Sequence, residues 1–351
     1  MKTYKVTFTP LEPYFFGNEK GFKYPVGKGE HKSGNKSQFT NQYFIRSERL
    51  PSQSTLLGAL RYHFLPVKKS NWDYCEAERD LNSATVGADG FDPAEDRKFG
   101  KLLKISPVFI CNSEHNLVPV PMNHKTGYFD ETPEKKFIRN STYTPFEKYS
   151  EVATPLGERL YAEDYDGKIG ACTDYMSLTD GAVVERTKIF TTEIRIGINR
   201  RTTRNGFFKK EYCMLQPGYS FGAFVDLEDD LEVNDGVVFL GQGKSAFAFN
   251  FVLAENTLAS DVKKYLPEGV AYCLGDTFAS PEIYGRSKFT VTDTKTYRVY
   301  SKKGVSVTKN DELYRVITAG SIFIPIDKED FAKTIYKENL NRIGYNEIII
   351  R

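Results

Sequence analysis

The sequence predicts an α+β fold in which strands outnumber helices, and three observations support this prediction. Stretches of alternating apolar and polar residues recur along the whole chain, whereas few stretches have helical periodicity. Runs of strands with few helices are typical of α+β folds rather than doubly wound α/β folds. The length of 351 residues predicts two domains, or one core with large insertions. Two β-α-β-β-α-β units with insertions would fit this order of elements.

The first half opens with a strand and a helix. Residues 2–16 alternate, and they predict a strand with a bent continuation at its two prolines. A helix follows, with Ser52 or Ser54 as its N-cap and Pro66 at its end. Four apolar residues share one face of this helix: Leu56, Leu57, Leu60 and Phe64.

Three segments with little periodicity are predicted to be insertions: residues 17–40, 70–100 and 122–190. The first holds five Gly and five Lys, which is typical of a flexible, basic loop. Such a loop is either a solvated linker or a segment that becomes ordered on an anionic partner. The second is polar and is expected to be irregular, and the third is expected to form a lobe or thumb. A hairpin of residues 102–110 and 117–120 lies between them.

Alternation returns in the second half and predicts most of the remaining strands. They are residues 193–199, 206–215, 219–227, 237–240, 246–253, 270–274, 289–307, 321–326 and 345–350. A short helix is expected at residues 256–265, and a longer one is expected from Asp327 through Arg342.

This pattern places a domain boundary where the alternation resumes. We expect an N-terminal domain of residues 1–190 and a C-terminal domain of residues 191–351. In the strand that follows the boundary, the side chains of Ile194, Ile196 and Ile198 are expected to face a core, with Arg195 on the opposite face.

Composition and motifs argue against several classes of protein. The chain has no apolar run of the roughly 18 residues that a membrane helix needs and no apolar N-terminal signal segment, so we expect a cytoplasmic protein without membrane contact. The five Cys form no CxxC pair, and the four His lack the spacing of a metal site. No nucleophile elbow or Walker A motif occurs, so we expect no catalytic site, metal or cofactor. Acidic residues 226–235 are expected to form a solvated turn, or to meet a basic partner protein.

A basic stretch is the first candidate binding site. Residues 194–210 contain six basic residues and no acidic one. Four of these are arginines: Arg195, Arg200, Arg201 and Arg204. Guanidinium groups bind phosphates in a bidentate manner, and the neighbouring Phe207 and Phe208 could stack on unpaired bases. The stretch therefore predicts RNA binding, and a solvated basic hairpin is the alternative.

Two further segments could bind phosphate. The loop Gly241-Gln242-Gly243-Lys244 would let backbone N–H groups approach an anion while Lys244 adds charge, although a tight β-turn would have the same composition. Ser52, Gln53 and Ser54 lie at a predicted helix N-terminus, which attracts anions, and Arg61 follows two turns later.

The order of several segments resembles one family of proteins. These segments are 51–61 after the opening strand, 193–208, 239–245, 319–323 and 343–346. In this order they resemble the RAMP subunit of type III-B (Cmr) CRISPR effector complexes that holds the 5′ tag of the crRNA. The glycine-rich loop departs from the family pattern, which is closer to Leu-Gly-Gly-Glu.

This resemblance implies both a fold and a function. It implies two ferredoxin-like (RRM-related) domains, the second of them degenerate, with a protruding thumb-like insertion. It also implies a non-catalytic subunit that grips the crRNA 5′ tag and contacts the large polymerase/cyclase-type subunit and the first backbone RAMP subunits. A metal-independent RAMP endoribonuclease that processes CRISPR transcripts is the alternative. Such an enzyme needs a general acid or base near the cut phosphate, and no histidine of this chain is placed to suggest one.

Overall fold

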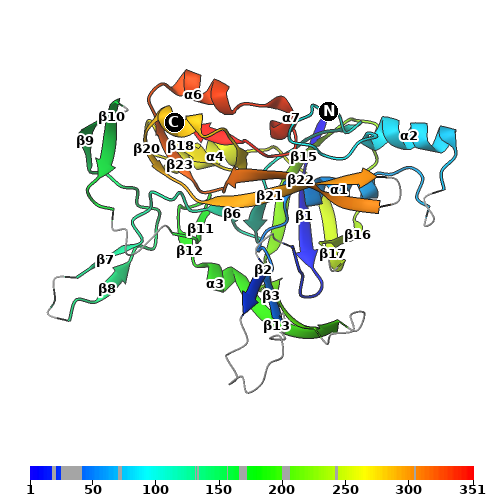
Figure 1. The fold of residues 1–351 in the computed structure, drawn as a ribbon, viewed down its shortest axis with the longest axis horizontal. Helices are drawn as coiled ribbons and strands as arrows, with labels where there is room; N and C mark the ends of the chain where they lie inside the picture. Colours follow the sequence, from blue (N-terminus) through cyan, green and yellow to red (C-terminus); the bar gives the residue numbers. More distant parts are fainter. Residues whose placement is uncertain are drawn as a thin grey trace, which may run out of the picture.

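The computed structural model confirms a mixed α+β fold that is rich in strands (Figure 1). It describes residues 1–17, 21–24, 42–69, 73–130, 132, 134–155, 157–165, 172–199, 206–241, 244–303 and 306–351. The helices of these ranges are α1 (Gln53–His63), α2 (Glu76–Val86), α3 (Arg186–Ile189), α4 (Leu258–Tyr265), α5 (Glu282–Gly285), α6 (Lys328–Ile335) and α7 (Glu338–Asn341).

The largest sheet contains the first strand of the chain as an interior strand. Its spatial order is β12-β11-β6-β5-β15-β1-β17-β16, and β4 also pairs with β15. The strands are β1 (Lys2–Pro10), β4 (Leu102–Ile105), β5 (Phe109–Cys111), β6 (Asn116–Pro119), β11 (Tyr175–Ser177), β12 (Val183–Val184), β15 (Ser220–Leu227), β16 (Gly236–Leu240) and β17 (Ser245–Leu253). Helix α1 packs on one face, which we call the inner face, because its apolar side and inward residues such as Val6 and Phe247 form one buried cluster.

The sheet joins strands from both sides of the expected domain boundary. That boundary falls at the start of β13 (Phe190–Asn199) and stays a prediction. Strand β1 pairs antiparallel with both β15 and β17, so the segments before and after the boundary share hydrogen bonds in this sheet.

Smaller sheets surround this one. β13 pairs with β14 (Gly206–Leu215), followed by β3 (Gln42–Arg46) and β2 (Gly21–Tyr24). A second sheet has the order β20-β23-β18-β24, with strands Ser287–Val291, Ile322–Pro325, Ala271–Cys273 and Ile348–Ile350. A third has the order β19-β22-β21, with strands Thr277–Phe278, Ser306–Ile317 and Thr294–Lys303. Two hairpins, β7–β8 (Gly127–Phe129, Phe137–Arg139) and β9–β10 (Tyr149–Thr154, Gly157–Ala162), project from the body, as does β13 (Figure 1).

The inserted segment 70–100 is not wholly irregular, because it contains α2. The backbone N–H of Cys75 donates to the Glu78 carboxylate at 3.0 Å, which caps this helix. Its buried residues are Asn82, Thr85 and Val86, whereas Leu81 is exposed. Two of these three buried residues are polar, so apolar residues in the sequence do not mark the buried side of this helix.

The expected orientation of β13 is wrong. Ile194 and Ile196 are 56% and 67% exposed instead of facing a core. β13 is an edge strand that pairs only with β14 among the described strands, and it leaves the body with that hairpin (Figure 1). Alternation predicted the strand correctly, but it carries no information on whether another layer covers the apolar face.

The helix expected from Asp327 through Arg342 is two helices, α6 and α7. The Asp327 carboxylate accepts the Asp330 N–H at 2.8 Å, which confirms its capping role. Tyr336 and Lys337 separate the two helices in an extended conformation. Phe331, Ile335 and Leu340 are buried, as predicted.

Candidate RNA interface

A pocket at the N-terminus of α1 brings two of the three candidate segments together. It has a volume of about 360 Å³ and we call it the α1 pocket. It is lined by Phe16, Gly17, Glu48, Leu50, Ser52, Thr55, Gly241 and Lys295. Ser52 and Gly241 were predicted site residues from segments far apart in the sequence, and the fold places them around one cavity.

Ser52 is the N-cap of α1. Its hydroxyl accepts the Thr55 N–H at 3.2 Å and contacts the Thr55 hydroxyl at 2.8 Å. Ser54 lies 3.0 Å from it, oxygen to oxygen, and accepts a hydrogen bond from the Tyr297 hydroxyl at 3.1 Å. The start of α1 is therefore polar and faces the pocket, while its apolar side is held in the core.

Lys295 supplies the positive charge of the pocket, and sequence reasoning missed it. Its ammonium lies 2.6 Å from the Asp276 carboxylate. Burial opposes the charge, but the nearby Asp276 outweighs it and keeps the pKa of Lys295 above its usual value. Lys295 comes from β21, which reaches α1 through the Tyr297–Ser54 hydrogen bond. The alternation of residues 289–307 indicated a strand, but not where that strand would lie.

Gly241 begins the turn that joins β16 to β17. Its φ is +76°, and a Cβ at this position would collide with the Phe15 carbonyl oxygen. Only glycine fits both the backbone angle and this contact. The backbone N–H of Lys244 donates to the Gly241 carbonyl at 3.1 Å and closes the turn. Gly241 lines the α1 pocket, and the phosphate-binding role of the loop stays a prediction, because Gln242 and Gly243 lie outside the described residues.

A second cavity, the central groove, continues from the α1 pocket because Glu48, Leu50 and Lys295 line both. It also contains Ala319 and Gly320, which contributed to the family resemblance without an assigned role. Its carboxylates serve internal contacts. Asp276 pairs with Lys295 and accepts the Ala319 N–H at 3.2 Å, and Asp174 pairs with Arg139. The groove therefore has less free negative charge than its composition implies.

Arg195 does not line the α1 pocket, but a series of side-chain contacts runs from it to the pocket wall. Its guanidinium lies 4.6 Å from the centre of the Tyr212 ring and forms an ion pair with Glu193 at 3.1 Å. Tyr212 packs on Phe15 with 5.5 Å between ring centres, and the Lys210 ammonium lies 5.0 Å from the Phe15 ring centre. Because Phe15 also contacts the Gly241 turn, the basic hairpin and the pocket lie on neighbouring surfaces.

Two predicted site residues are used inside the protein. The Gln53 side-chain amide donates to the carbonyls of Ser106 at 2.7 Å and Ile343 at 2.8 Å, and accepts the Val108 N–H at 3.2 Å. Arg61 donates to the carbonyls of Val86, the last residue of α2, and of residues 87 and 89 that follow it, at 2.6–2.7 Å. Neither side chain faces the α1 pocket, so we leave both out of the candidate interface.

The remaining predicted residues, Arg200, Arg201, Arg204, Gln242 and Gly243, lie outside the described residues. Within the described ranges, no group of three or more His, Cys, Asp or Glu is arranged to hold a metal ion. In the same ranges, no helix has the length and apolar character needed to cross a membrane.

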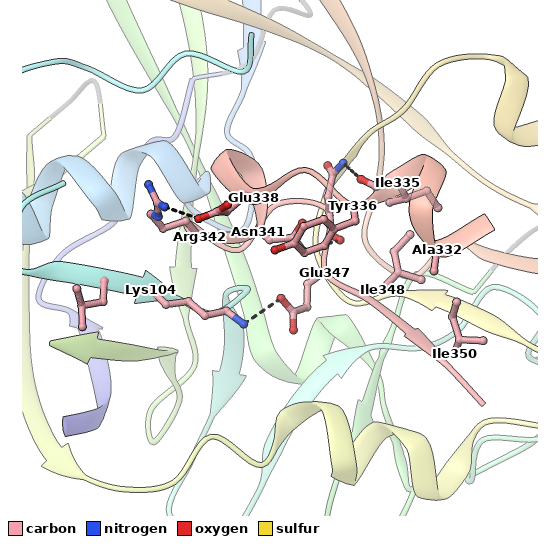
Figure 2. A pocket seen from close by; sticks show the side chains of 12 residues that line it. Lys104, Ala332, Ile335, Tyr336, Glu338, Asn341, Arg342, Glu347, Ile348 and Ile350 are labelled. Atoms are coloured by element: carbon pink, nitrogen blue, oxygen red, sulfur yellow. Dashed lines mark hydrogen bonds and ion pairs between the residues drawn. The ribbon is translucent and has the colours of Figure 1, made fainter. Parts of the chain in front are cut away.

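The pocket of about 420 Å³ shown in Figure 2 is separate from these surfaces. It lies between β4 and the C-terminal segment that contains α6, α7 and β24. Figure 2 shows Lys104 directed toward Glu347, with 3.5 Å between nitrogen and oxygen, and Arg342 directed toward Glu338. None of the predicted site residues lines it.

Two solved structures have a similar fold. One is a chain in the cryo-EM structure of the type III-B Cmr-beta bound to cognate target RNA, with a TM-score of 0.54 and 17% identity over 99% of this chain and 96% of that chain. Another is a chain in the cryo-EM structure of the same type of complex bound to cognate target RNA and AMPPnP, state 1. Its TM-score is 0.50, with 13% identity over 98% of this chain and 95% of that chain. No curated protein sequence matches the chain.

The family assignment comes from the sequence. A family model described as CRISPR-associated protein (Cas_Cmr3) matches residues 6–350, which is nearly the whole chain. This match agrees with the order of segments that predicted a type III-B RAMP subunit. The chain therefore belongs to the Cas_Cmr3 family of CRISPR-associated proteins, RAMP subunits of the type III-B Cmr complex.

Proposed function

We propose that the protein is a non-catalytic, RNA-binding subunit of a type III-B complex, and that it holds the 5′ tag of the crRNA at the α1 pocket. One observation carries this proposal: in a member of the Cas_Cmr3 family, the N-cap Ser52, the Gly241 turn and the Lys295 ammonium line one cavity. Hydroxyls at a helix start, a glycine turn and a half-buried lysine ammonium are groups that bind phosphate.

The RNA would continue from the pocket onto the basic hairpin. Arg195 and Lys210 lie beside Tyr212 and Phe15, next to the turn that ends at Lys244. The arginines at positions 200, 201 and 204 follow in the same segment of sequence, and we include them as proposed phosphate contacts. Neighbouring subunits, the large polymerase/cyclase-type subunit and the backbone RAMP subunits, would complete the binding surface. The cytoplasmic location stays a prediction.

We further propose that the chain is built from two ferredoxin-like units. Strands β18, β20, β23 and β24 with helices α5, α6 and α7 follow the β-α-β-β-α-β pattern, and their spatial order β20-β23-β18-β24 supports the second unit. In this unit β19 precedes α5, and the β21–β22 hairpin is inserted between β20 and β23. Around β1, the spatial order β5-β15-β1-β17 follows the same scheme, with α1 after the first strand, but the element between β15 and β17 is strand β16 rather than a second helix. A first unit of this kind would be interrupted by the inserted lobe.

The environment of His63 supports a non-catalytic role over the ribonuclease alternative. Its ring packs against Phe249 and Phe64, with 4.6 and 4.7 Å between ring centres. Burial and the nearby Lys68 lower its pKa. His31 lies outside the described residues. We expect no cleavage of repeat RNA with or without magnesium, and specific cleavage that His31→Ala or His63→Ala abolishes would favour the enzyme.

A pair of lysine variants tests the RNA site. Lys295→Gln removes the charge at the α1 pocket, and Lys104→Gln is the matched control. Lys104 also pairs with a carboxylate, and its side chain is 40% exposed against 33% for Lys295, but it lies in the other pocket. Fluorescence anisotropy with a 5′-tag RNA oligonucleotide and the assembled complex measures the affinity.

We expect Lys295→Gln to weaken binding by about tenfold or more, the usual effect of losing one charge-assisted contact. The control should bind like the parent protein. Replacing Arg200, Arg201 and Arg204 together by Ala should also lower the salt dependence of binding. Equal affinity of both lysine variants would remove the α1 pocket from the proposal.

A further inference from the structure

The large sheet has an outer face, opposite α1, that is covered at one end and open at the other. Near β5 and β15, the outer residues Phe109 and Phe224 are 1% and 4% exposed. They pack in a buried cluster with α4 and the sheet that contains β18 and β23. This part of the outer face is therefore an interior interface of the protein.

At the other end, β16 and β17 leave the same face open. Val237 and Phe239 of β16 are 58% and 64% exposed, and Val252 of β17 is 53% exposed. The register pairs Val237 with Ala248 and Phe239 with Ala246, so these four residues form one contiguous apolar surface, which we call the β16 face. The intervening Val238 and Leu240 are buried on the inner face. Exposed large apolar residues that adjoin one another mark interaction sites on soluble proteins.

The β16 face ends at an open strand edge. In the described part of the chain, β16 pairs with β17 and with no other strand. An edge strand presents unpaired N–H and C=O groups that can bond to an added strand. The face and the edge together fit an extended protein segment, which would bury its alternate apolar side chains on Phe239 and Val237 while its backbone bonds to β16.

The loop that leads into β16 indicates which charge a protein segment bound beside β16 should carry. It is rich in acidic residues, several of which have partners: Asp229 pairs with the N-terminal amine at 2.6 Å, Asp230 with Lys101, and Asp235 accepts the Phe251 N–H at 2.9 Å. Glu228 and Glu232 are exposed, and neither forms an ion pair with another described residue. Carboxylates at the entrance to an apolar face disfavour RNA and favour a partner with basic residues.

We propose that the β16 face docks an extended segment of another protein chain, a segment with apolar residues at alternate positions and Lys or Arg at the end that meets residues 228–232. The segment adds a strand to the large sheet beside β16. This surface is separate from the α1 pocket, and the inference is independent of where RNA binds.

The test uses the purified protein subunits of the cognate type III-B complex, added one at a time without RNA. Biolayer interferometry measures their binding to the full chain, and hydrogen exchange measures protection of the β16 amides. The Val237→Ser/Phe239→Ser double variant removes the apolar surface. The Tyr128→Ser/Phe129→Ser double variant is the matched control, because these two residues are 56% and 58% exposed on the β7–β8 hairpin, outside the α1 pocket and the basic hairpin. A Glu228→Gln/Glu232→Gln variant tests the charge, and circular dichroism confirms that each variant is folded.

One subunit should bind the parent chain and protect β16 from exchange. The Val237→Ser/Phe239→Ser variant should weaken this binding at least tenfold and remove the protection, whereas the control should do neither. The glutamate variant should make binding less sensitive to salt. Three results would overturn the proposal: no subunit binds, both double variants bind equally, or light scattering shows that the β16 face joins two copies of this chain.

Discussion

The two ends of α1 both carry polar residues that the sequence suggested for RNA binding, but the structure uses them differently. At the N-terminal end, Ser52 and Thr55 line the α1 pocket. At the C-terminal end, Arg61 donates all of its described hydrogen bonds to backbone carbonyls at the end of α2 and just after it. Gln53 lies at the N-terminal end but points into the protein, where it joins α1 to residues 106, 108 and 343.

This difference shows that charge and position in a motif do not identify an RNA contact. A guanidinium group has five N–H donors, and internal carbonyls can occupy them as fully as a phosphate would. Ser52 lacks charge, yet it lies where the half-buried Lys295 and a glycine turn converge.

Gln53→Leu should have the largest effect on stability. Leucine has a similar size but leaves two buried carbonyls and one N–H without their side-chain partner, which should lower the free energy of unfolding by about 3 kcal/mol or more. Urea denaturation of the purified chain measures this change. Ser54→Ala, which removes the hydroxyl contacts with Tyr297 and Ser52, is the stability control and should cost about 1 kcal/mol. Folded Gln53→Leu protein that binds RNA more weakly than the parent protein would mean that Gln53 belongs to the interface.

Arg61→Lys tests whether the protein needs the positive charge of Arg61 or its several hydrogen-bond donors. Lysine keeps the positive charge but cannot reach all three carbonyls, so we expect a loss of about 2 kcal/mol in stability with unchanged RNA affinity. Thermal denaturation and anisotropy measure the two quantities on the same sample. The opposite result, normal stability with weaker RNA binding, would show that the C-terminal end of α1 resembles its N-terminal end after all.

The sequence predicts the elements of this protein better than their arrangement. The apolar face of α1 and the alternation of β15 and β17 are local patterns, and each was predicted within a few residues. The pairing of β1 with both β15 and β17 joins residues more than half the chain apart, and no local pattern reports it. For the same reason Lys295 was missed, because β21 reaches α1 only through tertiary packing.

His63, in the last turn of α1, should make stability depend on pH. Burial, together with Lys68, lowers its pKa in the folded state, so below about pH 6.5 the unfolded chain binds a proton that the folded chain does not. Stability should therefore fall as the pH drops from about 7 to about 5.5, by at most about 1 kcal/mol from this group. His63→Phe should reduce this fall. His124, whose pKa burial also lowers, remains in both proteins and sets the residual slope. Parallel pH profiles of parent and variant would show that His63 has the same pKa in both states.

Arg195→Ala should have the smallest effect on stability and the clearest effect on RNA. Its ion pair with Glu193 is exposed on an edge strand, and such pairs contribute about 0–1 kcal/mol. We therefore expect a change within about 0.5 kcal/mol, well below that of Arg61→Lys. If Arg195 contacts a phosphate, the log–log dependence of RNA affinity on salt should lose about one unit of slope. Arg195→Lys should restore part of that slope, because an exposed ammonium still meets phosphate as a point charge. A large loss of stability with an unchanged salt slope would contradict this prediction. It would mean that Arg195, like Arg61, stabilises the folded protein through partners within the chain rather than by binding RNA.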